Sequence, residues 1–233
     1  MGKIKDETQQ EIVKTISEGR TRTNLLRKYE QSTLAYLVQR IPAWMSSDML
    51  TAIGFLGSVI VFLSFILAVY VNRYLLLVGV LGFVISWFGD SLDGRVAYYR
   101  HKPRKWYGFS LDVTVDWLGV ILMGGGFIVY AISPWKIIGF LFVVLYGWEM
   151  ITALLRYKII NQYSIDSGAF GPTEVRILIS LILVLEVIFK NSIIYTSSLA
   201  CLVLLIMNIL ETKKILQLAD ERDKNERGGE KIQ

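Results

Sequence analysis

Six stretches of mostly apolar residues, each about twenty residues long, are the feature that most limits how this chain folds. A helix needs about 20 mostly apolar residues to cross the hydrocarbon core of a bilayer. The stretches cover residues 50–71, 74–98, 110–132, 135–157, 173–189 and 192–210. The sequence therefore predicts an all-α fold, a polytopic membrane bundle of six transmembrane helices.

The basic residues gather in every second connection between these stretches. Eight lysines and arginines precede the first stretch, four lie between the second and third, two, Arg156 and Lys158, lie at the end of the fourth, and six follow the last. Each of the other connections holds or borders a single one, namely Arg73, Lys136 and Lys190. Because basic loops stay on the inner side of a membrane, we expect both termini in the cytoplasm and the protein in the cell inner membrane. The net charge of +5 then suits anionic lipid headgroups, and no nucleic-acid partner is expected.

The two ends of the chain differ in character from the apolar stretches. Residues 1–22 are polar and lack the apolar core of a signal peptide, so the first span is expected to act as the targeting signal. Residues 23–45 are amphipathic and predict a helix that lies in the membrane interface and ends before Pro42. A helix packed on the bundle is the alternative. Residues 46–210 would form the membrane domain, and 211–233 a charged, loosely ordered tail.

Four aspartates interrupt the second and third stretches near the connection between them, at Asp90, Asp93, Asp112 and Asp116. Ionisable side chains inside membrane segments are costly and are usually functional. Four carboxylates of one sign need protons, several basic partners or metal ions. Residues three or four apart share a helix face, and the short connection at 100–106 predicts antiparallel neighbours. All four carboxylates are therefore expected to converge near the cytoplasmic surface.

Metal is the favoured solution for these carboxylates. Hard oxygen ligands select Mg²⁺, Mn²⁺ or Ca²⁺. Zinc is not expected, because the one histidine, His101, lies in a loop and the one cysteine, Cys201, lies in an apolar stretch as a packing residue. Gly94 follows Asp93, and Gly108 precedes Asp112 by four residues. A missing side chain at these glycines would let a phosphate or a partner backbone approach closely.

The segments DSLDGRVA at 90–97 and GFSLDVTVD at 108–116 resemble the signature of the CDP-alcohol phosphotransferases. That signature is D-x2-D-G-x2-A-R, a short spacer and then G-x3-D-x3-D, and the likeness extends over residues 25–210. It implies transfer of a phospho-alcohol group from a CDP-linked donor, such as CDP-diacylglycerol, to a hydroxyl acceptor in the membrane, with release of CMP. It also implies two divalent ions, Mg²⁺ or Mn²⁺, and is compatible with a homodimer.

Two other hypotheses stay open at this point. The same signature suits a CDP-aminoalcohol donor with a lipid hydroxyl acceptor, so it does not decide which reactant is the lipid. A metal-binding transporter or scaffold without enzymatic activity would also carry carboxylates inside the membrane, although the ordered glycine and alanine positions have no explanation there.

The resemblance assigns roles to individual residues. Asp90, Asp93 and Asp112 would be metal ligands, and Asp116 would be both a further ligand and the general base for the acceptor hydroxyl. The residues that would contact the CDP-linked donor are Thr51, Gly94, Ala97 and Gly108. Near Thr51, a helix N-cap formed by Ser47 or Asp48 is the simpler interpretation of the polar residues.

The chain departs from the signature at one position, where Tyr98 stands in place of the arginine that follows the alanine. A phosphate contact made by that arginine would either come from another residue, with Arg95 and Arg100 as the candidates, or be lost. Further residues could contact the acceptor or a phosphate, namely Arg156, Glu174 and Arg176. For Glu174, compensation of a helix dipole is the structural alternative.

Overall fold

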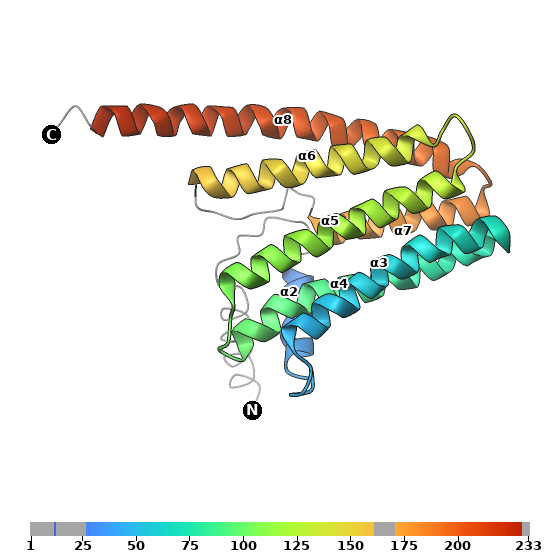
Figure 1. Ribbon diagram of the computed structural model, residues 1–233, viewed down its shortest axis with the longest axis horizontal. Helices are drawn as coiled ribbons and strands as arrows, with labels where there is room; N and C mark the ends of the chain where they lie inside the picture. The colour runs from blue at the N-terminus through green and yellow to red at the C-terminus, as the bar shows by residue number, and fades with distance from the viewer. Residues whose placement is uncertain (1–11, 13–26, 161–170, 230–233) are drawn as a thin grey trace.

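The computed structural model describes residues 12, 27–160 and 171–229 of the chain. The regular elements in this part of the chain are all helical (Figure 1). In chain order they are α2 (Arg27–Val38), α3 (Ser47–Tyr70), the short 3-10 helix η1 (Arg73–Leu75), α4 (Leu76–Tyr99), α5 (Lys105–Tyr130), α6 (Ile137–Ile160), α7 (Pro172–Ile188) and α8 (Ser192–Gly229).

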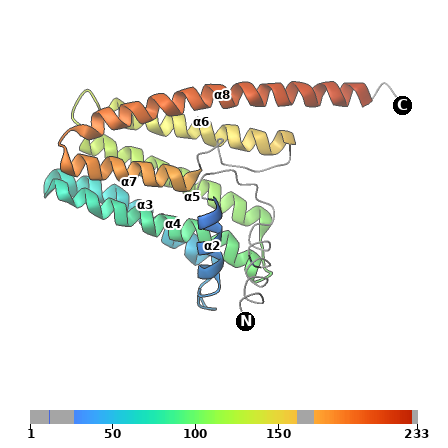
Figure 2. The ribbon, with the colours of Figure 1, turned by 180° about the vertical axis from the view of Figure 1, so that it is seen from behind.

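Successive long helices run antiparallel and form one bundle (Figures 1 and 2). Five helical segments are long and apolar enough to cross a membrane: α3, η1 with α4, α5, α6 and α8. The all-α membrane bundle predicted from the sequence is therefore confirmed. α7, with 17 residues, is the shortest of the bundle helices and begins partway along the bundle (Figure 1). The sixth span, which α7 would provide, stays a prediction.

The helices α3 and α4 approach each other more closely than larger side chains would allow, because glycines lie along the contact between them. A Cβ atom added to Gly57 would lie 2.4 Å from the backbone nitrogen of Ser86. One added to Gly89 would lie 2.2 Å from the backbone nitrogen of Gly54. Small residues permit such close backbone packing between membrane helices. We call this contact, formed by Gly54, Gly57, Gly82 and Gly89, the glycine seam.

The helix α2 crosses the end of the bundle instead of running along it (Figures 1 and 2). Leu34, Ala35 and Val38 are buried there in a cluster that includes Leu50 of α3 and Leu92 of α4. α2 ends at Val38, a few residues before Pro42. A helix packed on the bundle is the alternative given for this amphipathic segment, and the buried face of α2 makes that contact. Placement in the membrane interface stays a prediction, and the segment's first residues, 23–26, lie outside the described residues.

Arg100, at the end of α4, fastens the connection between α2 and α3. Its guanidinium donates to the backbone carbonyls of Met45 at 2.6 Å, Pro42 at 2.9 Å and Ile41 at 3.2 Å. These three hydrogen bonds use a large share of the N–H donors that one guanidinium offers. Arg100 therefore holds the start of α3 at a fixed place beside the end of α4.

The helix α8 continues far beyond the expected end of the sixth span near residue 210. It is helical to Gly229, whereas the charged sequence predicts a loosely ordered tail from residue 211. Ion pairs one turn apart support the extension, at Arg222–Glu226 and Lys224–Asp220, and such pairs stabilise solvated helices. Arg222 also donates to the carbonyls of Lys158 and Ile159 at the end of α6. These hydrogen bonds join the extended part of α8 to the end of α6.

Glu186, a buried side chain near the end of α7, accepts hydrogen bonds from backbone N–H groups at the start of α8. Its side chain is 1% exposed and accepts from the Tyr130 hydroxyl at 2.8 Å. It also accepts from the backbone nitrogens of Asn191 at 3.1 Å and Ile193 at 2.9 Å. The first N–H groups of a helix lack partners inside the helix, so Glu186 caps the start of α8 at the end of the bundle away from the aspartates.

Replacing Gly89 by alanine should destabilise the protein by about 1–3 kcal/mol, the cost of overpacking a tight contact. The added methyl group would meet backbone atoms of α3, which cannot rotate away. Thermal unfolding of the purified protein in detergent measures the effect. Gly125→Ala is the matched control, because its Cβ would only touch Phe62 at an ordinary 3.8 Å. Equal melting temperatures for the two variants would contradict a tight seam.

Candidate metal centre and adjoining pockets

Three of the four predicted aspartates come together between α4 and α5. Asp90 from α4, with Asp112 and Asp116 from α5, each places a carboxylate oxygen within 4.8 Å of the others. The antiparallel packing brings the end of α4 beside the start of α5, and the i,i+4 spacing sets both α5 carboxylates on one face. Three convergent carboxylate oxygens fit a hard divalent cation such as Mg²⁺ or Mn²⁺.

Asp93 lies beside this group but makes different contacts. Its side chain is 5% exposed and accepts a hydrogen bond from the Thr51 hydroxyl at 2.7 Å, and its other oxygen accepts from the Gly94 backbone nitrogen. The Ser47 hydroxyl donates to the Asp93 carbonyl at 2.9 Å. The glycine seam lets α3 approach closely enough for these bonds. Asp93 is therefore oriented by α3, and its place among the metal ligands stays a prediction.

Arg176 is a cation that the bundle brings to the same carboxylates. Its Nη1 lies 2.7 Å from Asp90 Oδ2, and its Nη2 lies 3.9 Å from Asp116 Oδ1. The Arg176 side chain is 16% exposed. It comes from the first turns of α7, whose start lies partway along the bundle (Figure 2). Arg176 thus offsets part of the negative charge that three clustered carboxylates create.

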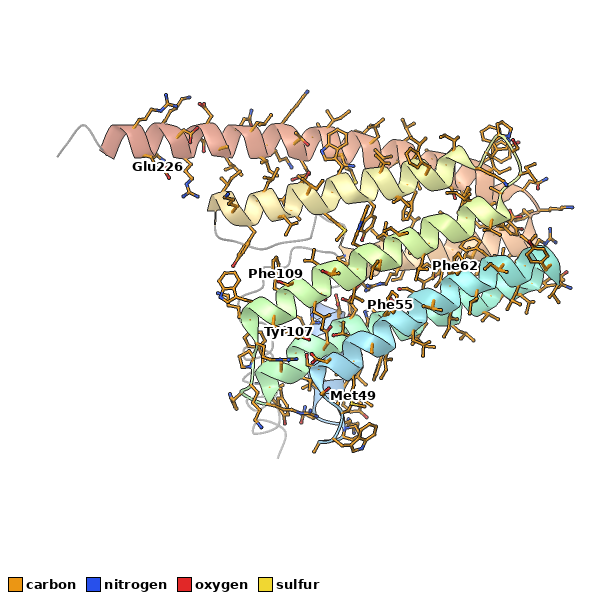
Figure 3. All side chains as sticks on the ribbon, viewed as in Figure 1. Met49, Phe55, Phe62, Tyr107, Phe109 and Glu226 are labelled. Atoms are coloured by element: carbon orange, nitrogen blue, oxygen red, sulfur yellow. The ribbon has the colours of Figure 1, made fainter. Side chains whose placement is uncertain are left out.

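Two pockets adjoin the carboxylates, one on each side. The inner pocket extends toward the middle of the bundle between α3, α5, α6 and α7, and the outer pocket opens at the bundle end beside the α4–α5 connection. They span about 940 and 1130 Å³, open space at their mouths included. Figure 3 labels one lining residue of each, Phe55 on α3 for the inner pocket and Phe109 near the start of α5 for the outer pocket.

Three residues belong to the walls of both pockets, namely Thr51, Asp93 and Asp112. Asp90, Asp116 and Arg176 line the inner pocket, so the charged centre opens into it. The two pockets therefore meet at a wall made of carboxylates and one hydroxyl. A molecule in either pocket would face these oxygens.

The predicted donor contacts all lie along the outer pocket. Its wall includes all four of them, Thr51, Gly94, Ala97 and Gly108. A Cβ at Gly108 would meet nothing within 4 Å, so this glycine leaves space that a bound molecule can occupy. Tyr98, the residue that departs from the signature, lines the same pocket. The donor role of these residues stays a prediction that their common location supports.

The predicted acceptor or phosphate contacts are more scattered. Of the five, only Arg176 lines either pocket. Arg95 is buried and donates to the Ser91 carbonyl, and Arg100 fastens the connection before α3. Arg156 pairs with Glu211 of α8. Glu174 accepts from the Gly171 backbone nitrogen at 3.0 Å, the capping contact of an acid in a first helical turn.

The start of α3 corrects one local prediction. Its N-cap is Ser46, whose hydroxyl accepts from the Met49 backbone nitrogen at 3.2 Å, and not Ser47 or Asp48. Ser47 instead donates to the Asp93 carbonyl, and Asp48 pairs with Arg104. Both residues that were expected as the cap therefore have partners elsewhere, Ser47 on α4 and Asp48 at the residue just before α5.

Several lining residues were not singled out from the sequence. Tyr146 and Met150 of α6 line the inner pocket. Tyr157 of α6 lines the outer pocket, and its ring centroid lies 5.6 Å from that of Phe109. Only Tyr157 carries a sequence signal, an aromatic side chain at the end of an apolar stretch, which is common in membrane helices. Tyr146 and Met150 lie inside the stretch, where the sequence does not distinguish them from packing residues.

Together, the helical bundle and the carboxylate centre between two pockets define an integral membrane protein with a site suited to cation-assisted chemistry. The model of the CDP-alcohol phosphatidyltransferase family matches residues 44–210. The chain belongs to this family, which confirms the resemblance of the aspartate signature. Members are transferases of phosphoric groups that use a CDP-linked donor and an alcohol acceptor in the membrane, generally with divalent metals. No curated protein matched the chain.

Asp112→Asn should weaken Mn²⁺ binding by about tenfold or more, because it replaces a charged oxygen ligand by a neutral one. Binding is measured on the purified protein by the loss of the free Mn²⁺ signal in electron paramagnetic resonance. Asp220→Asn, an exposed position on α8, is the control and should bind as the unchanged protein does. The metal assignment fails if both variants bind Mn²⁺ alike.

Proposed function

We propose that this chain transfers a phosphatidyl group from a CDP-linked donor such as CDP-diacylglycerol to a hydroxyl acceptor and releases CMP, with the aid of divalent metal. The observation that carries the proposal is the pair of pockets that share Thr51, Asp93 and Asp112 as a common wall. A transfer reaction needs two substrates held on opposite sides of the group that moves. The outer pocket would take the CDP moiety and the inner pocket the acceptor.

The proposed reaction is a displacement at phosphorus. The acceptor hydroxyl oxygen forms a bond to the phosphorus that carries the lipid, and the bond from that phosphorus to the bridging pyrophosphate oxygen breaks. CMP leaves with that oxygen, and the acceptor proton passes to a base. Little covalent chemistry falls to the protein in such a step, so positioning and charge stabilisation carry most of the catalysis.

Asp116 is the proposed base. It lies in the inner pocket, where the acceptor would stand, and it belongs to the carboxylate group. Arg176, between Asp90 and Asp116, holds a guanidinium at the same wall and would contact the acceptor or the transferred phosphate. A guanidinium offers several donors in one plane, so it can keep one carboxylate contact while it binds a substrate oxygen.

The metal ligands in this proposal are Asp90, Asp112 and Asp116, together with Asp93. Two divalent ions, Mg²⁺ or Mn²⁺, would supply positive charge to the attacking and leaving oxygens. Thr51 holds Asp93 in place from α3. The chain's own residues therefore gather and orient the carboxylates. The bound cations would offset the repulsion between these carboxylates and an anionic substrate.

The end of the bundle that carries the outer pocket would face the cytoplasm. Arg104 and Lys105 lie at its mouth, whereas Arg73, Lys136 and Lys190 stand singly at the other end. This distribution follows the positive-inside rule. α7 would serve as the sixth span, since 17 residues of helix extend about 26 Å.

Release of CMP by the purified protein tests the function directly. The donors are CDP-diacylglycerol and a CDP-aminoalcohol, each offered in Mn²⁺ or Mg²⁺ with alcohol or lipid hydroxyl acceptors. We expect CMP from CDP-diacylglycerol, abolished by a chelator. Release from the CDP-aminoalcohol with a lipid acceptor instead would reverse the donor assignment. Folded protein that releases CMP from no donor would point to a metal-binding protein without this activity.

Asp116→Asn should lower the rate of CMP release by about 10²-fold or more, the usual contribution of a positioned base. The rate is measured at a Mn²⁺ concentration that saturates the variant, because Asp116 also belongs to the carboxylate group. Asp220→Asn serves again as the control. A rate near that of the unchanged protein, with metal bound, would rule out Asp116 as the base.

A further inference from the structure

The outer pocket has an unusual balance of charge for a pocket that would hold a pyrophosphate. Among the residues that the structure describes, three carboxylates line it, Asp48, Asp93 and Asp112, and its lining cations are Arg104 and Lys105. An anionic ligand needs positive charge close to its phosphate oxygens. Both cations come from the α4–α5 connection and the start of α5, and neither is part of the aspartate signature.

The position that the family signature gives to an arginine does not supply this charge. Tyr98 lines the outer pocket at that position, and a phenol carries no positive charge at neutral pH. The neighbouring arginines are engaged away from the pocket. Arg95 is 3% exposed and donates to the Ser91 carbonyl, and Arg100 donates to three carbonyls before α3.

Arg104 is placed to supply the missing guanidinium. It is the residue just before α5, and its Nη2 pairs with Asp48 Oδ1 from the first turn of α3. Its guanidinium also lies over the Tyr107 ring, 4.2 Å from the ring centroid. The Arg104 side chain is half exposed at the pocket mouth. The ring and Asp48 hold the guanidinium beside the pocket, and most of its N–H donors can serve a ligand.

We propose that Arg104 binds the phosphates of the CDP-linked donor in place of the arginine that the family signature has at position 98. The inference rests on the proposed function, since it assumes that the outer pocket takes the CDP moiety. Asp48 competes with the ligand for the same guanidinium and holds it at the pocket mouth until the donor binds. Lys105, whose ammonium lies 5.4 Å from the Trp106 ring centroid, adds a point charge without the planar fork of an arginine.

Binding of CDP to the full-length protein in detergent with saturating Mn²⁺, measured by titration calorimetry, tests the proposal. Arg104→Gln should raise the dissociation constant of CDP by about tenfold or more, the effect of one lost charge-assisted hydrogen bond. Lys102→Gln is the matched control, because it removes a charge from the same connection at an exposed residue outside the pocket lining. Unchanged affinity of the Arg104→Gln protein for CDP would overturn the proposal.

Two further variants separate a phosphate contact from a structural ion pair. If Arg104 acted only by pairing with Asp48, then Asp48→Asn would weaken CDP binding as much as Arg104→Gln does, and the proposal would fall. We expect tighter CDP binding for Asp48→Asn, since it removes the competing anion. Tyr98→Arg combined with Arg104→Gln should restore CDP affinity, and no recovery would refute the exchange of roles between the two positions.

The same titration distinguishes this inference from the proposed function. If the wild-type protein binds Mn²⁺ but does not bind CDP, the proposed function is overturned, and the role of Arg104 with it. CDP binding that is equal in the unchanged protein and the Arg104→Gln protein would overturn only the role of Arg104.

Discussion

The glycine seam between α3 and α4 is the contact on which the rest of the site depends. At Gly57 and Gly89 a single Cβ would collide with backbone atoms of the other helix, so the two helices meet backbone to backbone. This approach brings Thr51 within 2.7 Å of Asp93 and Ser47 within reach of the Asp93 carbonyl. α3 carries no aspartate of the signature. It nevertheless orients Asp93, a signature carboxylate on α4.

The carboxylates pose an electrostatic problem that several helices solve together. Three carboxylate oxygens lie within 4.8 Å of one another, and like charges at that distance repel. Arg176 from α7 lies against Asp90 and Asp116, and the Thr51 hydroxyl satisfies Asp93 from α3. The centre is therefore assembled from four helices, although the signature residues lie on only two of them. Because α7 begins partway along the bundle, its first turns place Arg176 beside these carboxylates.

The sequence predicted those features that depend on local spacing. Apolar stretches of membrane length indicated the helices, and the i,i+3 and i,i+4 spacing of the aspartates indicated a shared face. Asp90, Asp112 and Asp116 do converge. Contacts between distant segments could not be read in the same way. Arg100 and Arg156 are basic residues at helix ends, as Arg104 is, yet the first binds backbone carbonyls and the second binds Glu211. Only the packing distinguishes them.

The extended α8 shows the same limit. The charged sequence after residue 210 resembles a solvated tail, but ion pairs one turn apart and the contact of Arg222 with the end of α6 maintain the helix. Helix propensity alone does not decide such a segment, because tertiary contacts contribute much of its stability. The N-cap at Ser46 differs from the expected Ser47 or Asp48 for a related reason. Those two side chains have partners on other helices.

The wall shared by the two pockets also limits how such a protein can change its substrate. Thr51, Asp93 and Asp112 face both pockets, so a substitution there would disturb the handling of both reactants at once. Tyr146 and Met150 belong to the lining of the inner pocket alone. On the proposed assignment, they could vary between related enzymes without loss of the common donor. Divergence in acceptor choice would then accumulate on α6 and α7, while the walls near α3 and α4 remained unaltered.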